Sequence, residues 1–169
     1  MSTKDFSISW PAEDVFFNNG ILYILENIEE VTHTNDFLFV NLCGYNLRQF
    51  MLDFPLFKKN LILITSKRLR PLADFLMDNH AKVIYVFDNN ESITSVLDQL
   101  ITTKKTLRIT RQHLLNYREY DLLSQYLHSG STEKTQEKYF RSYSTVQAWK
   151  NSLAHKFNLR RLMDITLRD

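Results

Sequence analysis

Residues 37–42 of the chain are FLFVNL, residues 61–65 are LILIT and residues 83–87 are VIYVF. Each run is almost continuously apolar and is bounded by polar or turn-forming residues, which is the pattern of a strand buried on both faces. Such strands are typical of parallel sheets that are covered by helices on each side. The three runs therefore predict an α/β fold in which a parallel sheet lies between helices.

Helical spacing of apolar residues appears between these runs. Leu47, Phe50, Met51 and Phe54 follow the i, i+3, i+4, i+7 pattern of an amphipathic helix. The same reasoning predicts strands at 6–10 and around Val31 and helices at 12–28, 69–76 and 93–100. Gly20 weakens the middle of the first of these helices, and Asn90 or Ser92 is expected to cap the last. About five strand-and-helix repeats predict a three-layer α/β domain over residues 1–101.

This rhythm resembles that of a response-regulator receiver domain, which carries a phosphorylatable aspartate at the end of its third strand. The corresponding residue here is Asn41, which lacks the carboxylate needed for Mg²⁺ and phosphoryl transfer. No lysine follows the strand that ends near Asp88, and only Ser66, with Thr65 beside it, keeps the expected type. The resemblance therefore implies a receiver-like scaffold that is not phosphorylated.

The charge of the chain divides near Lys105. Residues 1–105 contain ten Lys and Arg and thirteen Asp and Glu, whereas residues 106–169 contain eleven and six. A basic end of this kind is one sequence signal for a nucleic-acid-binding segment, although a solvated basic surface gives the same pattern. Residues 102–110 are polar, basic and aperiodic, so we expect a linker there between a domain at 1–101 and a domain at 111–169.

The last third of the chain carries a more specific pattern. Residues 142–146 are SYSTV and residues 156–157 are KF, and upstream lie Arg118-Glu119 and Leu122-Leu123. At this joint spacing the segment resembles the helix-turn-helix of the LuxR/NarL/FixJ family of bacterial regulators over about 50 residues. The resemblance implies an all-α four-helix domain at 111–169 that binds double-stranded DNA with its second motif helix in the major groove.

The family pattern assigns roles to individual positions. The residues that match the family's base readers are Gln147, Ala148 and Asn151, whose side chains suit adenine edges and thymine methyl groups. The residues suited to phosphate contact are Ser144, Thr145, Lys150, Lys156 and Arg160. Each of these has the alternative of being an ordinary solvent-facing residue, and Trp149 is predicted to pack in the core.

The scaffold helix departs from the family pattern at two places. The glycine that usually ends the preceding helix is replaced by Ser129, with Gly130 following, and the usual Ile-Ala pair is Thr135-Gln136. We therefore expect weaker packing, and affinity that depends on a partner subunit.

Other chemistry is disfavoured by composition. Three glycines leave no glycine-rich phosphate loop, one cysteine allows no internal disulfide, and the five histidines form no i, i+4 pair. We therefore expect no catalytic residues, no cofactor and no metal site. No run of apolar residues is long enough for a membrane span or a signal peptide, so a cytoplasmic protein is expected.

The short length and degenerate receiver half resemble the auxiliary regulators of capsule synthesis, mucoidy and acid resistance in enterobacteria. That resemblance implies an unphosphorylated transcription activator or repressor that pairs with a response regulator such as RcsB, or with a second copy of itself. Two alternatives remain: a protein-binding adaptor or anti-activator that uses the helix-turn-helix to cover a partner, and a small enzyme built on the α/β half.

Overall fold

The structure is a computed structural model that describes residues 8–27, 36–102 and 115–167. The chain divides into two compact units, of which the first contains residues 1–42 and 57–109 and the second contains residues 43–56 and 110–169. Most of the predicted linker at 102–110 lies outside the described residues. The division into domains at 1–101 and 111–169 therefore stays a prediction.

The first unit contains a four-stranded parallel sheet in the order β1-β2-β3-β4. Its strands are β1 (Ser9–Trp10), β2 (Phe37–Leu42), β3 (Asn60–Thr65) and β4 (Val83–Asp88). These bounds confirm the parallel sheet and the three strands on which its prediction rested. The predicted strand around Val31 lies outside the described residues.

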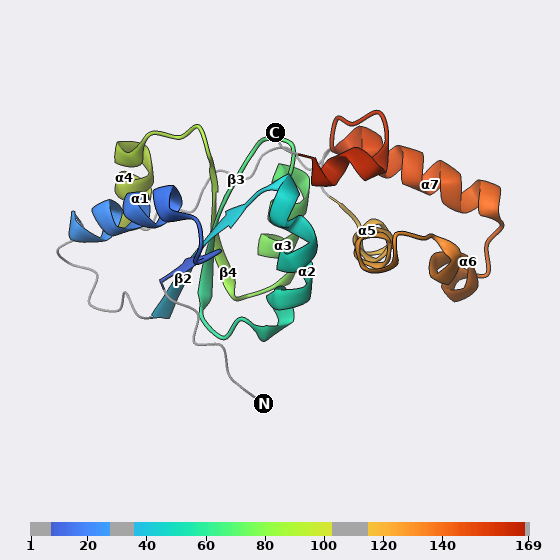
Figure 1. The fold of residues 1–169 in the computed structure, drawn as a ribbon, viewed down its shortest axis with the longest axis horizontal. Coiled ribbons are helices and arrows are strands. Elements are labelled where there is room, and N and C mark those ends of the chain that lie inside the picture. The colour runs from blue at the N-terminus through green and yellow to red at the C-terminus, as the bar shows by residue number, and fades with distance from the viewer. Residues whose placement is uncertain (1–7, 28–35, 103–114, 168–169) are drawn as a thin grey trace. The chain divides into compact units, whose positions relative to one another are not determined.

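Helices cover both faces of this sheet (Figure 1). Within the first unit they are α1 (Val15–Glu26), α3 (Arg70–Asn79) and α4 (Ile93–Ile101). On one face, Ile21 and Ile24 of α1 and Val96 of α4 join one apolar core with the strand residues Phe39, Ile62 and Phe87. Helix α3 contacts β3 and β4 and buries Leu72, Phe75 and Leu76. The strands are apolar on both faces because both faces are packed.

The second unit is helical in its described residues. Residues 44–56 form η2 (Gly44–Asn46), α2 (Leu47–Asp53) and η3 (Phe54–Leu56). The carboxy-terminal part forms α5 (Tyr117–Ser129), α6 (Glu133–Tyr139), α7 (Tyr143–Lys156) and the 3-10 helix η5 (Leu162–Thr166). Three α-helices and one 3-10 helix are thus described where four helices were predicted.

Candidate nucleic-acid interface

Helix α5 begins and ends with well-formed caps. The Asn116 side chain accepts a hydrogen bond from the Glu119 N–H at 2.9 Å, and the Glu119 carboxylate accepts one from the Asn116 N–H at 2.8 Å. This reciprocal pair is a capping box. At the other end Gly130 adopts φ 69°, the left-handed conformation that terminates helices most easily at glycine. Gly130 lies one position later than the glycine of the family pattern, and it still ends the helix.

Thr135 of α6 is fully buried and replaces an apolar residue of the family pattern. Its hydroxyl donates to the Gln125 side-chain oxygen on α5 at 2.9 Å. The Gln125 amide in turn donates to the Asp121 carboxylate at 2.8 Å. A buried hydroxyl with a partner avoids the desolvation cost of an unpaired one. The polar substitution is thus accommodated by a hydrogen-bonded chain between the two helices.

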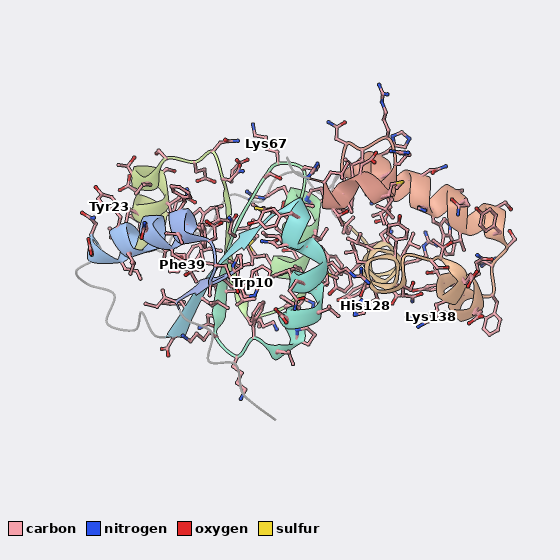
Figure 2. The ribbon with its side chains drawn as sticks, in the orientation of Figure 1. Trp10, Tyr23, Phe39, Lys67, His128 and Lys138 are labelled. Carbon is pink, nitrogen blue, oxygen red and sulfur yellow. The ribbon has the colours of Figure 1, made fainter. Side chains whose placement is uncertain are left out.

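Asp121 ties α5 to the end of α6. Its carboxylate accepts hydrogen bonds from the Lys138 ammonium at 2.7 Å and the Tyr139 hydroxyl at 2.9 Å. Burial by itself raises the pKa of Asp121, but hydrogen bonds from Lys138 and Tyr139 outweigh it, and the net pKa is lowered. Lys138 is labelled on α6 in Figure 2. The carboxylate therefore stays charged at lower pH than an ordinary aspartate and keeps its partners on α6.

The turn between α6 and α7 places a phenylalanine in an unfavourable position. Phe140 has φ 49° and its side chain is 94% exposed. Left-handed backbone is costly for a residue with a bulky side chain. Ser142 is the N-cap residue of α7, and its hydroxyl accepts a hydrogen bond from the Thr145 N–H at 3.3 Å. The turn is therefore short, strained and solvent-facing.

Replacing Phe140 with glycine is expected to stabilise the second unit by about 0.5–1 kcal/mol, because glycine adopts this φ without a steric penalty and little packing is lost. Urea unfolding of the full chain, followed by circular dichroism, measures the change. Asn158→Gly is the matched control, since Asn158 has φ 57° and is also exposed, but asparagine tolerates this region and should gain less. A loss of stability in Phe140→Gly would mean that the ring packs against the protein.

Helix α7 has one buried row and one exposed row. Val146, Leu153 and Phe157 are buried, with exposures of 0%, 0% and 1%. The predicted base readers lie outside this buried row. Ala148 and Asn151 are exposed, and Gln147 is half-buried. Within the described residues the side chains of Gln147 and Asn151 make no hydrogen bond to protein. Their amide groups are therefore available for an external partner.

Hydroxyl groups cluster at the start of α7. The Ser142 hydroxyl lies 3.0 Å from that of Ser144 and 2.9 Å from that of Thr145. Ser144 is exposed and Thr145 is half-buried. Both were predicted to contact phosphate, and hydroxyl and backbone N–H groups at a helix start are common in protein–DNA contacts.

The predicted phosphate-binding cations are in different environments. Arg160 is exposed. The Lys150 ammonium lies 4.5 Å from the centre of the Tyr126 ring, a cation–π geometry. Lys156 donates to the Glu119 carboxylate at 2.7 Å, and its side chain is only 26% exposed. The sequence did not predict this ion pair, because the family pattern identified Glu119 as a residue of the first helix and gave it no partner.

Trp149 was predicted to pack in the core and is half-buried. The Tyr139 ring contacts it edge-on at 5.8 Å between centroids, and the Arg118 guanidinium lies 4.3 Å over its ring. Trp149 thus joins α5, α6 and α7 through aromatic and cation–π contacts.

None of the helices in the described residues is long and apolar enough to cross a lipid bilayer. Across the same ranges, no three His, Cys, Asp or Glu side chains come together in a way that could hold a metal ion.

Comparison with known proteins identifies relatives over most of the chain. The family model described as the EcpR N-terminal domain matches residues 2–104. The Vi polysaccharide biosynthesis protein TviA of Salmonella typhi is 30% identical over 159 residues, which cover 89% of each protein. This relative spans both units, so the similarity is not confined to the α/β half.

A solved structure of the RcsB response regulator of Salmonella typhimurium, described for its conformational dynamism for DNA interaction, aligns with 90% of this chain and 92% of that one. The sequence identity is 15% and the TM-score is 0.36.

Proposed function

We propose that this chain binds specific DNA sequences through α6 and α7 as a helix-turn-helix. The chain belongs to the EcpR N-terminal domain family and is a TviA-like auxiliary regulator. The observation that carries the proposal is the division of α7 into a buried apolar row and an exposed row with Ala148 and Asn151. A helix of this kind can enter the major groove while its apolar row holds it to the scaffold.

We propose that the genes that this chain regulates concern surface polysaccharide. The name of the relative TviA refers to the biosynthesis of Vi polysaccharide. We propose that the chain pairs with a response regulator of the RcsB type, or with a second copy of itself. It acts through binding, without a catalytic step or a cofactor.

Salt dependence is the first test of DNA binding. The affinity of the full chain for duplex DNA is expected to fall with a log–log slope of about −2 to −3 per protomer, since about three phosphate-contacting cations release counterions. Fluorescence anisotropy between about 50 and 200 mM salt measures this slope. Adding the response regulator should tighten binding to the cognate duplex and leave a scrambled duplex little changed.

An adaptor that covers a partner predicts a different result. It would bind the response regulator and show no salt-dependent affinity for DNA, either alone or in the complex. That outcome would contradict the DNA-binding proposal and favour the adaptor. Mapping of DNA occupancy in cells with and without the regulator identifies the target promoters and tests the dependence in vivo.

A further inference from the structure

Two polar side chains meet at the carboxyl end of β2, outside the proposed DNA interface. The Asn41 amide donates a hydrogen bond to Oδ2 of Asp14 at 2.8 Å. The other oxygen of Asp14, Oδ1, accepts from the Phe17 N–H at 3.0 Å and so caps the start of α1. Asn41 and Asp14 are 27 residues apart in the chain. Through this pair, the second strand of the sheet is connected to the first turn of α1.

The position of this pair is chemically significant. In parallel α/β sheets the carboxyl ends of the strands are where ligands and ions are bound. The carboxylate of Asp88, at the end of β4, accepts from the Asn90 N–H at 2.9 Å within its own turn. The Asp14 carboxylate instead accepts a hydrogen bond from the Asn41 amide on β2. An amide donor stabilises a carboxylate much as a cation would, without adding a charge.

We propose that the Asn41 amide takes the place of a divalent cation at this edge of the sheet and holds β2 to α1 in a single, cation-independent state. The consequence is specific to this residue pair. With aspartate at position 41, two carboxylates would face each other at about hydrogen-bond distance, and a cation between them would relieve their repulsion. The stability of the first unit would then rise with Mg²⁺, whereas that of the natural chain does not depend on it.

The test uses the full chain with Trp149→Phe, so that Trp10 is the one tryptophan that remains. Trp10 belongs to β1, is buried and contacts Phe57 edge-on at 6.0 Å, so its fluorescence reports the first unit (Figure 2). Thermal unfolding is followed in EDTA and in about 10 mM Mg²⁺, at matched ionic strength. The variants are Asn41→Asp, the exchange Asp14→Asn with Asn41→Asp, and the control Asn19→Asp.

Asn41→Asp in EDTA is expected to lower the melting temperature of the first unit by about 4–8 °C, and Mg²⁺ should restore at least half of the loss. The exchanged pair places one amide and one carboxylate together again, and asparagine caps helices as well as aspartate does. Its melting temperature should lie within about 2 °C of that of the parent and should not change with Mg²⁺. Asn19→Asp adds the same charge to an exposed position of α1 and should also ignore Mg²⁺.

Three results would overturn the proposal: Asn41→Asp melting as the parent does, Mg²⁺ stabilising the parent and Asn41→Asp equally, or the exchanged pair melting no higher than Asn41→Asp. If Asn41→Asp does not fold in EDTA, the exchanged pair still decides, since its recovery requires the two side chains to interact.

Discussion

Replacing Glu119 with alanine is expected to lower the free energy of unfolding of the second unit by about 3 kcal/mol, because its largely buried carboxylate both closes the capping box of α5 and pairs with Lys156 on α7. Glu119 accepts hydrogen bonds from the Asn116 N–H and from the Lys156 ammonium. Its side chain is 11% exposed and that of Lys156 is 26% exposed. The variant therefore removes the ion pair between α5 and α7 and leaves the capping box open.

Circular dichroism during thermal unfolding measures this loss, which corresponds to a melting temperature lower by roughly 12–24 °C for a unit of this size. Glu119→Gln is the matched control. Glutamine can still close the capping box but does not pair with a charge, so its loss should be about half as large. An unchanged melting temperature in Glu119→Ala would contradict the structural role of this pair.

The same pair bears on the role of Lys156 in DNA binding. If Lys156 contacts phosphate as the sequence predicts, Lys156→Met in a folded protein should make the log–log salt slope shallower by about one unit. If Lys156 only holds Glu119, the slope should be unchanged while stability falls.

Alanine at Gln147 or Asn151 is expected to reduce binding to the cognate duplex by about tenfold to a hundredfold, while binding to scrambled DNA changes little. Each variant removes an amide that can make a paired contact with one adenine edge, and such contacts contribute about 1–3 kcal/mol of discrimination. Neither side chain makes a hydrogen bond to protein among the described residues, so the fold should be preserved. Each change should relax specificity at one base pair.

Fluorescence anisotropy on cognate and scrambled duplexes measures the ratio of affinities, with a thermal melt for each variant. Ser152→Ala is the control, since Ser152 is also exposed on α7 but was not predicted to contact a base. An unchanged cognate-to-scrambled ratio in folded Gln147→Ala and Asn151→Ala would mean that α7 does not read DNA in this register.

The elements with strong hydrophobic periodicity were predictable from the sequence. The strands at 37–42 and 83–88 were placed within a residue of their bounds, and the helix at 93–101 begins after the cap Ser92, one of the two expected. The first helix was predicted as 12–28 and is Val15–Glu26, because Asp14 caps it and the chain before it forms a turn. Local hydrogen bonding, rather than apolar spacing, set that boundary.

The sequence by itself determined the α/β class of the first half, the parallel sheet and the amphipathic character of α7, because each depends on the spacing of apolar residues along one element. Only the tertiary structure decided which polar groups meet. Asn41 and Asp14 are 27 residues apart, and Lys156 and Glu119 are 37 apart. Hydrophobic burial is non-directional and leaves a periodic trace in the chain, whereas a hydrogen bond requires two specific atoms at about 3 Å, a condition that exists only once the elements have packed.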